Sequence, residues 1–480
     1  MNREIKTGEK RPSISRAGLF GILMAAQLLL VEGTVICQEG RLRPENVIEL
    51  VRRNYPAIRA ARAEEGAAAA EADAARTSLL PRVEIDWQQT RGTRNNIFGP
   101  FFPQGSVNPI SGPLLNRSSI GESVWGSGGG VAIAWELFDF GARRAGIDLA
   151  KRQLDGARAR TVETGFEAEV MAIDRLLAVA AAEQKIRSAV AAVERLESFV
   201  REVETLVVNE LRPGADSSRA AVELAIARNH VIEARQDDAL ARVALAEAVG
   251  LAGQVIEIDA SDLTSRRPAG LPPERPVTAA GHPLLVRQLM AIEIINARRQ
   301  ILNRSIYPRL SWQTNLFGRG SGALIDGQRL ANRGFYPDTA NWLTGLTLTF
   351  IPSEIFRNRA NRREEEQNLM AATSRLDEAR QQLKSAESRA KALEEAAIAY
   401  AENAPLQLEA ARLTELRVRK RYDAGLGTVA EVAEAQRLLA QAEAGLALAH
   451  LTLWRARLAE CRARGDLAPF LTLLNKGGAN

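Results

Sequence analysis

The sequence predicts a mainly α-helical chain with a small β part that belongs in a membrane, built from two copies of one strand–helix unit. Three observations favour this fold class. Two stretches of about 70 residues carry almost no turn signals, four short runs alternate apolar and polar residues, and the first half resembles the second at fixed offsets. Aromatic residues are only 5% of the 480 residues, a composition that favours long helices over a compact sandwich.

The first 37 residues have the features of an export signal. A positive start that includes Lys6, Lys10, Arg11 and Arg16 precedes an almost wholly apolar run from Ala17 to Val31. This run is shorter than the ~20 residues that a membrane span needs, and a buried core helix is the alternative. Cys37 lies where a lipid-modified cysteine would lie, but the bulky Ile36 before it fits lipidation poorly. Ordinary cleavage near Gln38 is the other possibility.

The two halves of the chain are related by duplication. Residues 54–82 match residues 281–309 at an offset of 227, and later positions such as Trp135 and Phe350 match at an offset of 215. The smaller offset indicates that the loop between the strands is 12 residues shorter in the second half. We therefore divide the chain into four parts: a signal peptide at 1–37, a first structural repeat at 38–270, a second at 271–470, and a C-terminal tail at 471–480.

Each repeat contains two predicted strands. Val83, Ile85 and Trp87 illustrate the alternation, because polar residues separate them and give the strand one apolar and one polar face. Five of the six tryptophans lie in or beside such runs, and aromatic residues at strand ends are typical of a membrane interface. A soluble sheet with one face on a core is the alternative. The strands are expected at about 82–92, 128–138, 309–317 and 342–351.

A very long helix follows the second strand of each repeat, at about 142–211 and 354–424. At 1.5 Å per residue each helix is ~100 Å long, and a helix of this kind must form a coiled coil. A shorter helix returns after a break at Arg212-Pro213-Gly214 or at Gly425-Leu426-Gly427. Pro405 interrupts the second long helix, and we expect a local kink there because proline removes a helix hydrogen bond.

Four strands cannot close a barrel, so a membrane-inserted sheet implies several chains. Open strand edges are not tolerated in lipid, and three chains would supply 12 strands, although this argument alone does not fix the number. The net charge of +5 is spread along the sequence, which gives no support for nucleic-acid binding. The three histidines are scattered, and no nucleophile, phosphate-loop or metal-ligand pattern stands out. We therefore expect no enzyme, no cofactor and no metal site.

Three motifs in order give the chain a family resemblance. Leu79-Leu80-Pro81 precedes the first strand, and the segment 135–144 (WELFDFGARR) leads from strand to long helix. The segment 421–428 (RYDAGLGT) is followed by Glu431 and the Ala435-Gln436 pair. Together with the duplication, this set resembles the TolC-like outer-membrane efflux protein family over roughly residues 44–465.

The resemblance implies a homotrimer with a 12-stranded barrel in the outer-membrane lipid and a coiled-coil tunnel across the periplasm. The tunnel would narrow at the helix turns, where a periplasmic adaptor (a membrane fusion protein) and an inner-membrane transporter engage it. The expected function is the passive exit duct of a tripartite efflux pump. The alternatives are the exit duct of a type I secretion system and, from a different class, a soluble periplasmic coiled-coil scaffold. The sequence does not indicate the substrate.

The resemblance also assigns roles near the helix turns. Glu431 and Glu434 would form an acidic constriction, or else be solvated surface residues, and Asp216 is their counterpart in the first repeat. Asp216 is equally explained as a helix N-cap. Tyr422 would hold the closed tip, or else pack in the coiled coil. The expected adaptor-docking residues are Gly425, Leu426, Thr428, Leu211 and Gly214.

Overall fold

The computed structural model describes residues 44–93, 123–254, 256–258, 261–271, 281–322 and 333–475. All of them belong to one compact unit, Leu42–Asn480. The expected signal peptide and the expected lipidation site at Cys37 lie outside the described residues. Within the described residues, no helix is both long enough and apolar enough to cross a membrane.

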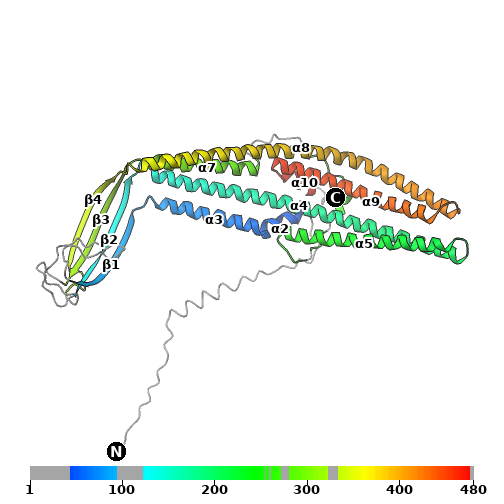
Figure 1. Cartoon of the computed structure of the whole chain (residues 1–480), viewed down its shortest axis with the longest axis horizontal. Helices are drawn as coiled ribbons and strands as arrows, with labels where there is room; N and C mark the ends of the chain where they lie inside the picture. The colour runs from blue at the N-terminus through cyan, green and yellow to red at the C-terminus, as the bar shows by residue number, and fades with distance from the viewer. Residues whose placement is uncertain are drawn as a thin grey trace, which may run out of the picture. The chain divides into compact units, whose positions relative to one another are not determined.

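The expected mainly helical fold with four strands per chain is confirmed (Figure 1). Two helices dominate it, α4 (Ala142–Val208) with 67 residues and α8 (Glu354–Asp423) with 70. The other elements are α2 (Pro44–Asn54), α3 (Pro56–Thr77), β1 (Arg82–Thr93), β2 (Ser123–Phe138), α5 (Gly214–Ala248), α6 (Ser261–Ser265), α7 (Pro283–Arg304), β3 (Arg309–Ser321), β4 (Thr339–Thr349), α9 (Val429–Arg464) and α10 (Ala468–Asn475).

The long helices each pack against two shorter helices that follow one another along them. Near the sheet, successive contacts run from α3 to α4 to α7 to α8, and nearer the helix turns they run from α5 to α4 to α9 to α8 (Figure 1). The short helices α3 and α7 both have 22 residues and begin at a proline, whose fixed φ suits the first helical position. The helices thus form a layer with α3 and α5 along one edge and α8 along the other.

The four strands form one antiparallel sheet in the order β1-β2-β3-β4. Its register places most apolar residues of the four strands on one face, because Val83 lies opposite Ile133, Trp135 opposite Trp312, and Leu316 opposite Trp342. The face is exposed in the single chain, and Ile85 and Trp342 are 79% and 76% accessible. The apolar face comprises Val83, Ile85, Trp87, Val131, Ile133, Trp135, Leu310, Trp312, Leu316, Trp342, Leu346 and Leu348.

β2 begins five residues earlier than the sequence suggests, at Ser123. The cause is the run Gly128-Gly129-Gly130, which is typical of a turn but lies inside the strand. A Cβ atom on Gly129 would come within 2.6 Å of the Trp87 ring, and one on Gly130 within 2.6 Å of Phe317. These glycines therefore permit close approach of neighbouring strands rather than a turn.

The largest hydrophobic core lies midway along the helices, where α2, α4, α5, α9 and α10 meet. Trp454 is fully buried there, with its ring edge against Phe470 at a centroid distance of 5.6 Å. α10 extends across the expected boundary between repeat and tail at residue 471 and buries Leu474, and the division of the chain into repeats stays a prediction. α8 remains α-helical through Pro405, and the kink expected there stays a prediction.

Removing the Trp454 side chain should destabilise this core. We expect Trp454→Ala to cost about 3–5 kcal/mol, because it deletes a fully buried ring and leaves a cavity. The loss of helical circular dichroism on heating measures the effect. Thr452→Ala, an exposed position on the same helix, is the matched control and should change little. Equal melting temperatures for both variants would contradict the assignment of this cluster as the main core.

Candidate functional site

Arg212 joins the two helix turns at the end of the molecule remote from the sheet. It lies between α4 and α5, and its Nη2 donates to the backbone carbonyl of Tyr422 at 2.7 Å. Its Nη1 donates to the carbonyl of Gly427 at 3.3 Å, and its guanidinium carbon lies 4.5 Å from the centre of the Tyr422 ring. One side chain of the first turn therefore binds two carbonyls and an aromatic face of the second.

Tyr422 is a packed residue at the centre of this junction. It is 1% exposed, and its ring meets Phe199 edge-on at a centroid distance of 5.1 Å. Val203 from α4 and Val432 from α9 belong to the same cluster. Burial raises the pKa of the Tyr422 phenol, and its hydroxyl has no hydrogen-bond partner among the described residues. The ring thus contributes to the contact between the two helix pairs through packing.

Glu431 and Glu434 are both exposed, and each has a partner within the chain. Glu431 completes a capping box with Thr428: its carboxylate accepts from the Thr428 backbone N–H at 3.2 Å, and its own N–H donates to the Thr428 hydroxyl at 3.3 Å. Glu434 accepts from Arg437 Nε at 2.8 Å, and this hydrogen bond lowers the pKa of the Glu434 carboxyl.

Asp216 is not a helix N-cap, so that expectation is wrong. The cap of α5 is Pro213, which has an extended backbone, and the N–H of Asp216 donates to the Pro213 carbonyl at 3.0 Å. Because Pro213 occupies the N-cap position, α5 begins at Gly214, before Asp216 is reached. Asp216 instead lies in the first turn of α5, where its negative charge is favoured by the helix dipole.

The two turns share one backbone design. Each long helix ends in a left-handed residue, Glu210 with φ 59° or Gly425 with φ 75°. The next residue closes the turn, because the N–H of Leu211 donates to the Leu206 carbonyl and that of Leu426 to the Arg421 carbonyl, each at 2.9 Å.

Exposed leucines follow from this design. Leu211 and Leu426 are 68% and 71% accessible and are counterparts at the repeat offset of 215. Gly214 is the first residue of α5 and Thr428 is the N-cap of α9. The turns therefore share an exposed leucine, while their flanking residues differ, with Pro213 in the first turn at the position of Thr428 in the second.

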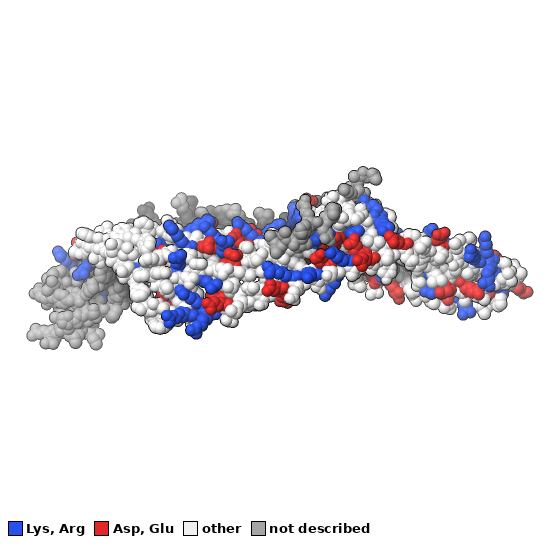
Figure 2. All heavy atoms as spheres, turned by 90° about the horizontal axis from the view of Figure 1, so that it is seen from above, with Lys and Arg blue, Asp and Glu red and all other residues white. Residues whose placement is uncertain are grey.

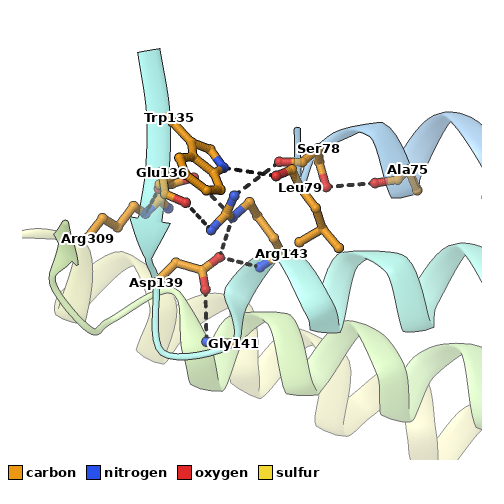
Figure 3. Close-up of polar contacts among 9 residues, drawn as sticks. All are labelled: Ala75, Ser78, Leu79, Trp135, Glu136, Asp139, Gly141, Arg143 and Arg309. Carbon is orange, nitrogen blue, oxygen red and sulfur yellow. Dashed lines mark hydrogen bonds and ion pairs between the residues drawn. The ribbon is translucent and has the colours of Figure 1, made fainter. Parts of the chain in front are cut away.

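A second polar cluster lies at the other end of α4, where β2 passes into the helix (Figure 3). Arg143 donates to Asp139 Oδ2 at 2.9 Å, to the carbonyl of Ser78 at 3.2 Å, and to the carbonyl of Glu136. Asp139 in turn accepts from the backbone N–H of Gly141 at 3.0 Å and of Arg143 at 2.8 Å. The end of α3, the end of β2 and the start of α4 are therefore held together by the hydrogen bonds and ion pairs of Arg143.

The second repeat has the corresponding contact in a weaker form. At the repeat offsets, Asn358 and Ser305 are the counterparts of Arg143 and Ser78. Asn358 is 5% exposed and donates from Nδ2 to the Ser305 hydroxyl at 2.9 Å. A single neutral hydrogen bond thus replaces a charged, multiply bonded arginine, so the two joints between sheet and helix differ in strength.

Comparison with known proteins decides the family. The family model described as outer membrane efflux protein matches residues 47–251 and 282–459, which is most of the chain. The chain belongs to this family. Its members are channels of the outer membrane that extend into the periplasm, not enzymes, so the resemblance of the sequence motifs is confirmed. No curated protein matches the sequence.

Solved outer-membrane channels share the fold. A CusC structure gives a TM-score of 0.72 at 15% identity, covering 88% of this chain and 92% of that one. CmeC of Campylobacter jejuni gives 0.71 at 14% identity, with 88% and 85% covered. The open state of MtrE from Neisseria gonorrhoeae gives 0.66 at 16%, with 88% and 89% covered. At these identities the similarity concerns the fold.

Loss of Arg212 should loosen the contact between the helix turns. In Arg212→Ala the carbonyls of Tyr422 and Gly427 lose a charged donor, which is worth about 1.5–3 kcal/mol. We expect hydrogen exchange of backbone amides in residues 422–429 to accelerate about tenfold or more. Arg201→Ala, which removes an exposed arginine of α4, is the control and should leave this exchange unchanged. Equally slow exchange in both variants would contradict the conclusion that Arg212 holds the two helix turns together.

Proposed function

We propose that this outer-membrane channel protein is the passive exit duct of a tripartite efflux pump, and that it works as a homotrimer. The observation that carries the proposal is that one chain has two different unfinished edges. β1, α3 and α5 lie along one edge, and β4 and α8 lie along the other. Unlike edges pair head to tail, and such contacts close into rings when the rotation permits. Three copies would supply 12 strands and a lumen wide enough for solutes.

Exposed apolar residues on the two helical edges support this arrangement because they lie at matching heights. Leu416 and Leu406 of α8 are 7 and 17 residues before its end and lie on adjoining sides of the helix. Val222 and Ile232 of α5 are 8 and 18 residues after its start and also lie on adjoining sides. α8 runs toward the helix turns and α5 runs away from them. The apolar pair on α8 of one copy would therefore meet the apolar pair on α5 of the next in an antiparallel contact.

The two faces of the sheet support the same arrangement. The apolar face would meet lipid, and the opposite face carries polar residues such as Glu84, Asp86 and Gln313, which suit a water-filled interior. Alternation of this kind is the pattern of membrane strands around a wet lumen. A soluble periplasmic scaffold would leave the whole apolar face exposed to water.

At the helix turns, three copies of Glu431 and Glu434 would place six carboxylates around the axis. Such a ring attracts cations and sets an electrostatic barrier to anions. The exposed Leu211 and Leu426 would dock the periplasmic adaptor, since two equivalent apolar tips per chain offer a repeated surface. An inner-membrane transporter would supply the energy.

Cross-linking tests the edge-to-edge contact. In a chain with Leu416→Cys and Val222→Cys, oxidation should join neighbouring copies into covalent dimers and trimers on a denaturing gel. Cys461 should not interfere, because burial raises the pKa of its thiol to about 12 and keeps it protonated. The matched control pairs Leu416→Cys with Val243→Cys, which lies 21 residues further along α5, about 32 Å away. Equal cross-linking of both pairs would contradict the proposed register.

Single-channel conductance tests the duct and its acidic ring. We expect small cation-selective openings from the unmodified protein. In Glu431→Gln/Glu434→Gln the ratio of cation to anion permeability should fall close to one. The helix cap should be retained in this variant, since Gln can still complete the capping box. Because Arg437 lowers the pKa of Glu434, its negative charge is lost only when the pH falls through that lowered value, so selectivity should persist below the usual glutamate range.

The matched control is Glu395→Gln/Glu409→Gln, two exposed glutamates of α8 away from the turns. This variant should keep the selectivity of the unmodified protein. Unaltered selectivity in both variants would contradict the acidic ring but not the exit duct. A folded oligomer that never conducts would contradict the exit duct.

A further inference from the structure

The positive charge of the chain gathers where the helices meet the sheet. In α3, α4, α7 and α8, the ten helix residues nearest the sheet contain together eleven Lys or Arg and only four Asp or Glu. This excess is larger than the net charge of +5 of the whole chain. The charge is therefore not spread evenly, as the linear sequence suggested. Figure 2 shows Lys and Arg clustered over the helices next to the sheet.

Four of these residues, Arg144, Arg304, Arg359 and Arg363, form what we call the basic belt. All four are exposed, and none forms an ion pair with another residue that the structure describes. They belong to three different helices that lie side by side, α4, α7 and α8. The belt is bounded, because Glu364, Glu365 and Glu366 follow directly in α8 and reverse the sign. All four guanidinium groups are exposed in the single chain; Arg144 and Arg304 belong to α4 and α7, whereas Arg359 and Arg363 belong to α8, the edge at which the proposed ring places the next copy.

Exposed aromatic side chains lie beside the belt. Phe138 and Phe140 meet at a centroid distance of 4.7 Å, and Phe140 stacks on Tyr307 at 5.1 Å. Phe140 holds a left-handed backbone with φ 52°, which is unusual for a bulky residue. On α8 the guanidinium of Arg359 lies 5.8 Å from the ring of Phe356, which is 71% accessible. Aromatic rings next to free arginines are the composition of a boundary between lipid tails and headgroups.

We propose that the basic belt binds the phosphates of anionic phospholipid headgroups in the inner leaflet of the outer membrane. The membrane-facing apolar surface ends at this level and the helices beyond it enter the periplasm, so lipid phosphates lie at the height of the belt. Arginine forks bind phosphate oxygens in pairs, and each cationic side chain near a charged leaflet contributes on the order of 1 kcal/mol. Lipid binding here is independent of what the channel transports.

Lipid competition tests the proposal. The full-length oligomer is reconstituted in phosphatidylcholine with brominated phosphatidylglycerol or brominated phosphatidylcholine, and quenching of tryptophan fluorescence gives their relative binding. The tryptophans of the sheet lie close to the belt, whereas Trp454 is buried and supplies a constant background. We expect phosphatidylglycerol to be preferred, by about fivefold for each arginine that reaches a phosphate.

The decisive variant is Arg304→Gln/Arg359→Gln/Arg363→Gln, in which the preference should fall to no more than the roughly fivefold that the remaining Arg144 can supply. The control, Arg235→Gln/Arg412→Gln/Arg417→Gln, removes three exposed arginines remote from the sheet and should retain it. Circular dichroism and oligomer size establish folding, and the single substitutions provide the same ratio if the triple variant does not fold. Equal binding of both lipids by the unmodified protein would overturn the proposal. So would a preference that inorganic phosphate abolishes, because the site would then take a soluble anion.

Discussion

The unpaired edges of the four-stranded sheet are the constraint on which the rest of the structure depends. β1 and β4 each leave a row of backbone donors and acceptors without a partner strand among the residues that the structure describes. Water can satisfy such groups, but lipid cannot, and each unsatisfied group costs several kcal/mol. A sheet with one apolar face across all four strands therefore requires another strand at each edge. The proposed ring of three chains satisfies both edges with the same contact.

The helical layer follows from the same requirement. Each long helix is too long to stand alone in water. Two shorter helices in succession cover one side of α8, and two such pairs cover both sides of α4. α5 and α8 expose apolar residues at similar distances from the helix turns, and these residues, like the strand edges, have no partner among the described residues. Duplication explains why the chain has two similar edges, because one strand–helix unit repeated with small changes generates both. The differences between the repeats lie at the joints and turns. Arg143 of the first repeat is replaced by Asn358 in the second, and among the described residues only the first turn has an arginine, Arg212, that binds the other turn.

Most of the fold could be predicted from the sequence, because periodicity reports local structure directly. Alternation located the strands, and the absence of turn residues located α4 and α8. The start of β2 was predicted at residue 128, the first of three glycines, whereas the strand begins at Ser123, because these glycines permit close strand contact inside it. Asp216 resembled a cap because the residue type fits, whereas the proline three positions earlier determines where α5 begins.

Much of the candidate site could not be predicted, because it depends on contacts between distant residues. Arg212 is separated from Tyr422 by 210 positions, and no local pattern announces that its side chain binds the second turn. The basic belt is likewise assembled from three helices whose ends meet only in the fold. The resemblance did point to the turns and to Tyr422 and Glu431, but it supplied no partner for either residue.

In the proposed ring, the β1 edge of each chain pairs with the β4 edge of the next and closes one continuous sheet. Electron microscopy of the purified protein in lipid nanodiscs tests it most directly, because strand order is visible in the density. The expected result is a threefold ring in which β1 of each chain pairs with β4 of the next. A protein that stays a single chain in lipid, or a ring in which β1 pairs with β1, would contradict the account.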